Sequence, residues 1–219
     1  MQRIPEPELM NDPAQAQAYA EADFSEPHDA FVATYREHFP ETRGQVLDLG
    51  CGPADVTLRF ARAHPDCTVL GIDAAEQMLQ LGRHACHRAG LSDRIELQIA
   101  HLPHTPLPHE AYAAIISNSL LHHLNDPMTL WNTVAEHAHH GTQVFVMDLL
   151  RPDSPEAARA LVDTHAANEP DVLRHDFYHS LRAAYREDEV EAQLRAAGLG
   201  VLRVEIISDR HFIVYGRVA

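Results

Sequence analysis

Residues 46–54 constrain the fold of this chain more than any other stretch. Three apolar residues surround Asp48 and predict a short buried strand, which is followed by a turn containing Gly50 and Gly52 and by a helical pattern from about Asp55. Glycine permits positive φ and lets a ligand lie directly on the backbone. The amides that open the following helix would form an electropositive cup for a carboxylate or phosphate. The stretch therefore predicts a strand–turn–helix unit with a binding site at the turn.

An acidic residue follows the next apolar run. Residues 68–72 predict a second buried strand that ends in Asp73, 23 positions after Gly50. An acid at this place can accept hydrogen bonds from both hydroxyls of a ribose. A dinucleotide-binding turn would carry a third glycine where Asp55 stands, and the charge of Asp55 would repel a pyrophosphate. Asp48 instead suits a ligand whose nearby end carries an ammonium group.

With these motifs the chain resembles the class I S-adenosylmethionine (SAM)-dependent methyltransferases over about residues 44–150. The matching segments are residues 48–52, 71–73 and 116–124, in the order and spacing of that family's motifs. The resemblance implies an α/β, Rossmann-like fold with a mostly parallel seven-stranded sheet, a C-terminal antiparallel hairpin and helical lid elements. It also implies that SAM is the cofactor.

The C-terminal residues test this fold independently. Residues 201–207 and 212–218 are rich in strand-forming residues and are separated by only four positions. So short a link cannot make a parallel crossover, so the two strands must be antiparallel. A dinucleotide-dependent dehydrogenase would not predict this hairpin.

The length of 219 residues predicts one domain with accessory segments. We expect residues 1–42 to form an N-terminal helical lid, beginning with a loosely held lead-in over residues 1–12. Residues 43–219 would form the SAM-binding Rossmann-like domain. Within it, residues 151–186 are longer than one crossover helix requires and predict two helices broken near Pro170, which would cover the active site.

The resemblance also implies which residues contact the cofactor. Aromatic residues in a lid can screen the sulfonium from water and attract it by cation–π interaction. Tyr19 fits this role and simple packing equally well, whereas Phe31 and Tyr35 are expected to pack on the sheet. Met78 suits either adenine contact or the core, and His101 or backbone groups would read adenine because the acid common in the family is missing. The expected cofactor-binding residues are Asp48, Gly50, Cys51, Gly52, Asp73, Ala74, Met78, His101, Leu102, Asn118 and Tyr19.

Four residues are candidates for a catalytic role. Asn118 would stand at the carboxyl end of the fourth strand, where ligands bind in open α/β sheets, although a turn asparagine is the structural alternative. His122 and His123 look like a catalytic pair, yet histidines here often only pack at a helix start in the family. Asp176 and Tyr178 are the best candidates in the 151–186 segment. The expected catalytic residues are thus Asn118, Tyr178, Asp176 and His122.

Composition excludes several other chemistries. The formal charge is −15 and all 17 basic residues are arginines, so Schiff-base chemistry and a phosphate-binding lysine are absent. The acidic balance argues against nucleic acid and favours a small-molecule substrate. No long apolar run or leader pattern is visible, so we expect a cytoplasmic protein, monomeric or homodimeric, without membrane contact. The three cysteines and 17 histidines lack persuasive metal-binding spacing, so no metal site is expected.

Three functions remain open. The first is methyl transfer to a small O, N, S or C nucleophile by SN2 displacement at the sulfonium. The second is intramolecular cyclisation of SAM to azetidine-2-carboxylate and methylthioadenosine, as in the methyltransferase-like azetidine-2-carboxylate synthases. The third is SAM binding without catalysis. No strong acid–base dyad is visible in the sequence, which favours a mechanism based on positioning.

Overall fold

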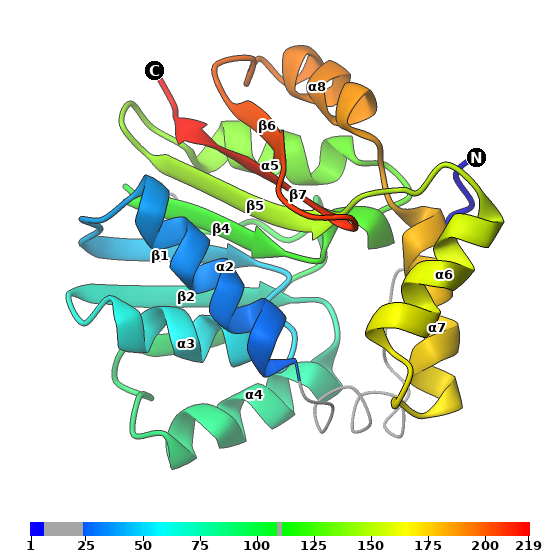
Figure 1. The fold of residues 1–219 in the computed structure, drawn as a ribbon. Coiled ribbons are helices and arrows are strands. Elements are labelled where there is room, and N and C mark those ends of the chain that lie inside the picture. Colours follow the sequence, from blue (N-terminus) through cyan, green and yellow to red (C-terminus); the bar gives the residue numbers. More distant parts are fainter. Residues whose placement is uncertain (7–23, 109–110) are drawn as a thin grey trace.

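The computed structural model describes residues 1–6, 24–108 and 111–219, which form an α/β fold around one seven-stranded sheet (Figure 1). The strand order is β3-β2-β1-β4-β5-β7-β6. Strands β1 to β5 are parallel, while β7 is antiparallel to β5 and to β6. The predicted mostly parallel sheet with a C-terminal hairpin is therefore confirmed. The strands are β1 (Gly44–Leu49), β2 (Cys67–Asp73), β3 (Ile95–Ile99), β4 (Ala114–Asn118), β5 (Gln143–Leu149), β6 (Arg203–Ile206) and β7 (His211–Arg217).

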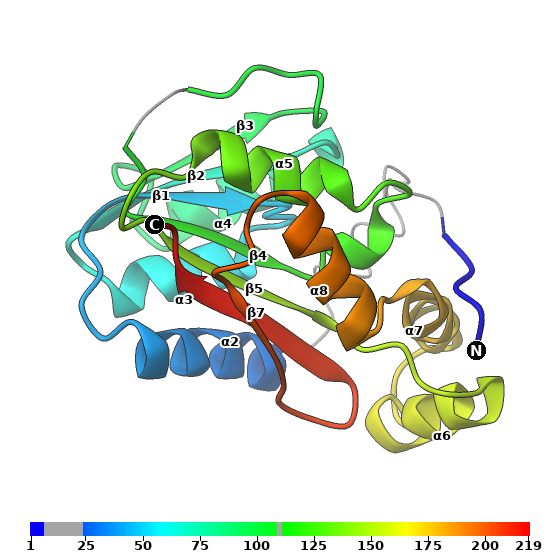
Figure 2. The ribbon, with the colours of Figure 1, turned by 90° about the horizontal axis from the view of Figure 1, so that it is seen from above.

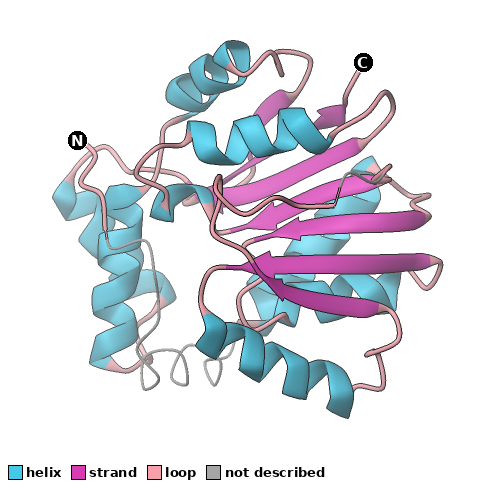
Figure 3. Cartoon of the chain, turned by 180° about the vertical axis from the view of Figure 1, so that it is seen from behind, coloured by secondary structure: helices cyan, strands magenta, loops and turns pink. Residues whose placement is uncertain are grey.

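Helices cover both faces of the sheet. Figure 2 shows α2 and α3 below the sheet and α5 and α8 above it, and α4 packs on the same face as α2 and α3. The pair α6 and α7 lies beside the carboxyl ends of β4 and β5, as Figures 1 and 3 show. The helices are α2 (Ser25–His38), α3 (Asp55–Ala63), α4 (Glu76–Arg88), α5 (Met128–His137), α6 (Pro155–His165), α7 (Asp171–Ala183), α8 (Glu187–Ala196) and the 3₁₀ helix η1 (Leu121–His123).

The burial of β5 explains this layered arrangement. Every residue of β5 is buried, and after Gln143 the strand is an apolar run broken only by Asp148. Val144 and Val146 point into the core beneath α5 and α8, whereas Phe145 and Met147 point into the core beneath α2 and α3. Side chains of a strand alternate between its faces, and a parallel sheet covered on both faces buries both sets.

The predicted packing role of two aromatic residues in α2 is confirmed. Phe31 and Tyr35 are both 0% exposed and lie in the core on the α2 side of the sheet. Phe31 meets Phe145 edge to face with ring centroids 5.0 Å apart. The Tyr35 hydroxyl lies 2.9 Å from Thr42 Oγ1, within hydrogen-bond distance, so its polar end is satisfied inside the core.

The expectation of a loosely held lead-in is wrong for residues 1–6. Arg3 donates hydrogen bonds to the carbonyl oxygens of Ala183 (2.6 Å), His122 (3.1 Å) and Leu124 (2.9 Å). The amide of Ile4 donates to Arg182 O at 3.0 Å. Carbonyl groups at the end of a helix lack hydrogen-bond donors within the helix. In the last turn of α7, Arg3 and Ile4 supply those donors. The prolines suggested a free loop, but long-range bonds attach it.

Some predictions fall outside the described part of the chain. The helix predicted over residues 13–22 and Tyr19 lie there, so the N-terminal lid stays a prediction. The two helices predicted within residues 151–186 are observed as α6 and α7, on either side of Pro170. Among the described residues, no helix combines the length and apolar character needed to cross a membrane.

Candidate functional site

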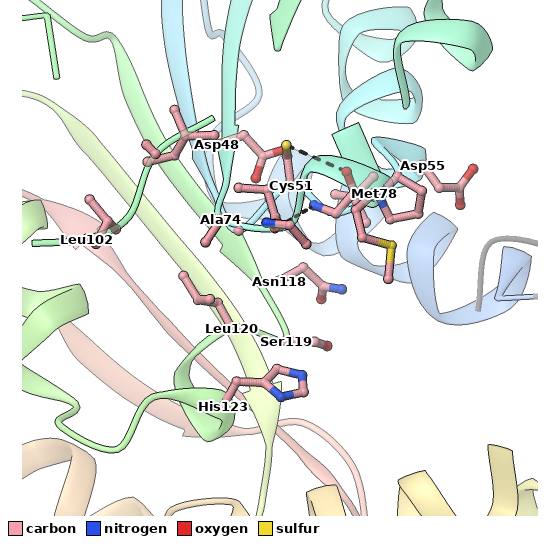
Figure 4. A pocket seen from close by; sticks show the side chains of 18 of the residues that line it. Asp48, Cys51, Asp55, Ala74, Met78, Leu102, Asn118, Ser119, Leu120 and His123 are labelled. Atoms are coloured by element: carbon pink, nitrogen blue, oxygen red, sulfur yellow. Dashed lines mark hydrogen bonds between the residues drawn. The ribbon is translucent and has the colours of Figure 1, made fainter. Parts of the chain in front are cut away.

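A cavity opens where the strand order of the sheet reverses. Strands β1 and β4 are neighbours, but the chain continues from β1 toward one edge of the sheet and from β4 toward the other. Open α/β sheets bind ligands at the carboxyl ends of such strands. Every expected cofactor-binding residue within the described part of the chain lines this cavity (Figure 4), namely Asp48, Gly50, Cys51, Gly52, Asp73, Ala74, Met78, His101, Leu102 and Asn118.

The glycine turn, residues 50–53, needs its two glycines for different reasons. Gly50 (φ +73°) and Gly52 (φ +51°) both adopt left-handed backbone conformations that disfavour other residues. A Cβ atom on Gly50 would also lie 2.9 Å from the Leu120 side chain, so this glycine lets two loops approach closely. At Gly52 a Cβ would meet no atom of the described residues within 4 Å. The backbone at Gly52 is therefore open to a ligand.

The amides of the glycine turn hold it against β2. The amides of Gly50 and Cys51 each donate to Ile72 O at 2.9 Å, and the amide of Gly52 donates to Asp73 Oδ2 at 2.9 Å. These three amides are engaged within the protein. The amides that open α3, a helix without a side-chain cap, therefore match the predicted electropositive cup better than those of the turn.

Asp73 is anchored but retains acceptor capacity. Its Oδ1 accepts a hydrogen bond from the Ala75 amide at 2.8 Å and its Oδ2 accepts one from Gly52. A carboxylate has about four acceptor positions, so two remain for hydroxyl donors. Burial raises the pKa of Asp73, and the hydrogen bonds from Ala75 and Gly52 reduce that effect without cancelling it. The side chain is thus rigid and suited to a ribose.

Asp48, which precedes the glycine turn, and Cys51, which is part of it, are both buried. Asp48 is 2% exposed and accepts a hydrogen bond from the Thr57 hydroxyl at 2.6 Å. Burial raises the pKa of Asp48 to about 7, with a smaller lowering by the bond from Thr57 and a further rise from the charge of Asp73. Burial also raises the pKa of the Cys51 thiol, which disfavours its thiolate form.

Asn118 is the last residue of β4 and lies across the cavity from the glycine turn. Figure 4 shows Asn118, Ser119 and His123 facing the same open space, with Met78 opposite them. Ser119 has φ +58°, a conformation uncommon for a residue other than glycine. Such strained positions cluster at functional sites, because the surrounding structure must hold them.

Sequence reasoning missed the contact that holds α2 to the cavity rim. His28 Nδ1 lies 2.6 Å from Asp55 Oδ2, and Arg59 Nε donates to the same oxygen at 2.9 Å. Burial raises the pKa of Asp55, but the hydrogen bonds and charges of His28 and Arg59 outweigh it and the net pKa is lowered. Asp55 is thus an ionised, paired group on the cavity wall. Its partner on α2 is 27 positions away in the sequence, and no local pattern links them.

Three expected catalytic residues do not line the cavity. His122 is 3% exposed and is not among the residues that line the cavity, whereas the neighbouring His123 is. Tyr178 packs with the α6–α7 pair, where the guanidinium of Arg182 lies 5.3 Å from its ring centroid. Asp176 lies on α7, 3.5 Å from His175 Nδ1. Roles for these residues in catalysis stay predictions.

The structure also contains an acid–base pair that the sequence did not reveal. His122 Nδ1 lies 2.6 Å from Asp148 Oδ1, and Asp148 accepts hydrogen bonds from the amides of Leu121 (2.8 Å) and Leu149 (2.7 Å). Burial raises the pKa of Asp148 and lowers that of His122, but their mutual attraction outweighs burial, so the net shifts are downward for Asp148 and upward for His122. The two residues come from η1 and β5, which meet only in the folded chain.

Glu6 lies between His122 of this pair and His123, which lines the cavity. Its Oε1 lies 3.1 Å from His123 Nδ1 and accepts a hydrogen bond from Ser180 Oγ at 3.0 Å. Burial raises the pKa of Glu6, but the hydrogen bond and charge of His123 outweigh it and lower the pKa overall. We call Glu6, His122, His123 and Asp148 the histidine cluster.

Comparison with known proteins finds similarity to methyltransferases. Residues 46–141 match a family model described as a methyltransferase domain. The 27-O-demethylrifamycin SV methyltransferase of Amycolatopsis mediterranei is 26% identical over 166 residues, which cover 75% of this chain and 57% of that protein. The demethylmenaquinone methyltransferase of Symbiobacterium thermophilum is 34% identical over 89 residues, which cover 40% of this chain and 34% of that protein. The chain thus aligns with less than two thirds of each of these relatives.

Solved structures support the fold. A SAM-dependent methyltransferase from Aquifex aeolicus aligns with a TM-score of 0.68 at 19% identity, over 93% of this chain and 97% of that chain. The mitomycin 7-O-methyltransferase MmcR aligns with a TM-score of 0.69 at 18% identity, over 94% of this chain and 58% of that chain. The fold is therefore the Rossmann-like fold of these methyltransferases. The family match covers residues 46–141, less than half of the chain, so it identifies a methyltransferase domain over those residues.

Proposed function

We propose that this protein is a cytoplasmic enzyme of small-molecule metabolism that transfers a methyl group from SAM to a small nucleophile by SN2 displacement at the sulfonium. The observation that carries the proposal is the single cavity that gathers the glycine turn, Asp73 and Asn118 at the ends of β1, β2 and β4. Relatives named for methylation of a rifamycin and of demethylmenaquinone support a small acceptor. The acidic charge disfavours nucleic acid, and three free cysteines suit a reducing compartment.

The residues of the cavity fit SAM by their chemistry. The two remaining acceptor positions of Asp73 suit the two ribose hydroxyls, and the open backbone at Gly52 leaves room for a ligand beside the turn. When ionised, Asp48 suits the ammonium group of the amino acid end, while the amides opening α3 suit its carboxylate. The side chains of Met78 and Leu102 offer apolar contact to adenine, and His101 offers a polar group at its edge.

Beyond binding SAM, the protein must align the acceptor with the methyl group. SAM supplies an activated methyl group on a cationic sulfur, so the protein gains most by orienting the acceptor and excluding water. Asn118 is placed to orient a nucleophile through its amide oxygen or to hold the amino acid end of SAM. His122 is too buried to meet a substrate directly, so we assign it a positioning role through Asp148 and the backbone of η1.

We also propose that residues 1–42 and 151–186 cover the cavity during the reaction. Hydrogen bonds from Arg3 to α7 and to η1 join the two segments at the carboxyl edge of the sheet. In this arrangement Tyr19 would shield the sulfonium, and Asp176 and Tyr178 would shape the acceptor site.

Product analysis tests the proposed reaction. The purified protein is incubated with SAM alone and with a panel of small hydroxyl, amine, thiol and carbon acceptors, and the products are followed by mass spectrometry. Formation of S-adenosylhomocysteine that depends on an acceptor supports methyl transfer. Methylthioadenosine formed from SAM alone would show cyclisation, and binding without turnover across the panel would show a non-catalytic SAM-binding protein; either result contradicts the proposal.

Calorimetry tests the proposed cofactor site separately. Asp73→Ala should weaken SAM binding by about 1–3 kcal/mol, because the ribose loses its hydrogen-bond acceptor. Asp93→Ala is the matched control, since Asp93 is exposed and lies away from the cavity. Equal affinity of the Asp73→Ala and Asp93→Ala proteins would remove Asp73 from the site.

A further inference from the structure

The histidine cluster brings three metal-ligating side chains together beside the cavity. Glu6 comes from the N-terminal segment, and His122 and His123 are the last two residues of η1. One ligand atom from each lies within 4.8 Å of the other two. Glu6 Oε1 is 3.1 Å from His123 Nδ1 and 3.7 Å from His122 Nε2. The three side chains are only 12%, 19% and 3% exposed for Glu6, His123 and His122, respectively.

These separations match the spacing of ligands around one ion. Zn²⁺ binds histidine nitrogen and carboxylate oxygen at about 2.0–2.2 Å in tetrahedral sites, which places two ligands of the same ion roughly 3.4 Å apart. The two measured separations from Glu6 Oε1 fall on either side of this value. The distance to His122 Nε2 is also too long for a direct hydrogen bond. A cation between the three atoms would bind all of them at once.

The surrounding residues orient these ligands as outer-shell partners do in metal sites. Asp148 lies 2.6 Å from His122 Nδ1, and this contact directs Nε2 of the same ring toward Glu6. Metal-bound histidines usually donate their other ring N–H to a carboxylate in this way. Ser180 Oγ donates to Glu6 Oε1, and Arg3 bonds the carbonyl of His122, which holds the two ends of the cluster together.

We propose that Glu6, His122 and His123 bind a divalent transition-metal ion of the Zn²⁺ class. Two imidazoles and one carboxylate suit such ions, whereas Mg²⁺ and Ca²⁺ prefer oxygen ligands. Three protein ligands leave one tetrahedral position open, as in catalytic zinc sites. Because His123 lines the cavity, an ion bound to it would lie beside that cavity. An ion there can bind a hydroxyl group or water and lower its pKa. The proposal does not depend on methyl transfer.

Metal titration of the full chain tests the proposal. The protein is stripped with a chelator and titrated with Co²⁺ alone, whose visible absorption reports its coordination, and then with competing Zn²⁺. One equivalent of Co²⁺ with low-symmetry, strongly absorbing coordination is expected, and Zn²⁺ should displace it. Glu6→Gln and His123→Ala, made separately, should each weaken this binding by at least about 10-fold, which is the smallest loss typical of changes around a metal site.

A matched control separates this site from adventitious binding by the 17 histidines of the chain. The double variant His84→Ala/His87→Ala removes two exposed histidines one turn apart on α4 and should bind Co²⁺ as the wild type does. Circular dichroism checks that each variant is folded. Wild-type protein that binds less than one equivalent would overturn the proposal. So would Glu6→Gln and His123→Ala proteins that bind normally, or a loss seen only in the control.

Discussion

The glycine turn and the histidine cluster lie on opposite sides of one cavity, yet they are assembled in different ways. The residues around the turn come from two consecutive strand–loop units, β1 and β2, and Asp73 is bonded to the turn by a single amide contact. The histidine cluster combines the N-terminal segment, η1 and β5. Burial raises the pKa values of Asp48 and Asp73 on the first side, whereas ion pairing lowers those of Glu6 and Asp148 on the second.

This difference shows two ways in which a fold positions acidic groups. On the side of the glycine turn, the carboxyl groups of Asp48 and Asp73 are buried with backbone and hydroxyl donors, so they stay available to a charged or hydroxylated ligand. On the side of the histidine cluster, each carboxylate has a histidine partner. The cluster should therefore matter more for the stability of the protein, and the turn more for ligand affinity.

The largest expected effect is on stability. Asp148→Ala should lower the free energy of unfolding by about 3–5 kcal/mol, because it removes the carboxylate closest to the buried His122. The amides of Leu121 and Leu149 also lose their acceptor. Urea denaturation measures the change. Asp209→Ala, which breaks the more exposed pair with His165, is the control and should cost no more than about 1 kcal/mol. If Asp148→Ala also lowered the free energy of unfolding by no more than about 1 kcal/mol, the histidine cluster would not matter more for stability than the glycine turn does.

A smaller loss of stability is expected from a substitution in the glycine turn. Gly50→Ala should cost about 2–4 kcal/mol, since alanine is strained at φ +73° and its Cβ would press on Leu120. Gly90→Ala is a matched control, because Gly90 has a similar φ of +66° but a Cβ there would meet nothing within 4 Å. The difference between the two variants in denaturation midpoints measures the contact with Leu120. Equal losses would show that backbone strain alone explains the need for Gly50.

The smallest expected effect is the pH dependence of SAM affinity. Below pH 7 the carboxyl group of Asp48 carries a proton, and above it the group is ionised and attracts an ammonium. The dissociation constant for SAM should thus fall between pH 6 and pH 8, by no more than about tenfold. Calorimetry at three pH values measures it, with Asp48→Asn expected to flatten the dependence and Asp93→Asn to leave it unchanged. An equally steep dependence in the Asp48→Asn protein would assign the titration to another group.

Much of the side around the glycine turn could be predicted because its signals are local. Apolar runs separated by Gly50, Gly52 and Asp73 define two strands and the loop between them, and parallel strands bring their carboxyl ends to one edge. Phe31 and Tyr35 were predictable as core residues by their helical spacing. The C-terminal hairpin followed from the length of its link alone.

The histidine cluster could not be predicted in this way. His122 and His123 are adjacent in η1, but only His122 lies at hydrogen-bond distance from Asp148 and only His123 lines the cavity. Their sequence alone does not say which histidine takes which place. Likewise, the proline-rich start of the chain resembled a free loop. Its attachment depends on carbonyl groups of α7 and η1 that meet Arg3 only in the folded protein.

By itself, the sequence determined the order of strands and helices, the glycine turn and the acidic residue beside it, because these depend on residue spacing and on backbone preferences within a few positions. The tertiary structure alone decided which polar groups pair inside the protein. Glu6 meets His123, and His28 meets Asp55, across long stretches of chain. Such pairs form because buried charges must find partners, and the partner is whichever group the packed sheet and helices bring within reach.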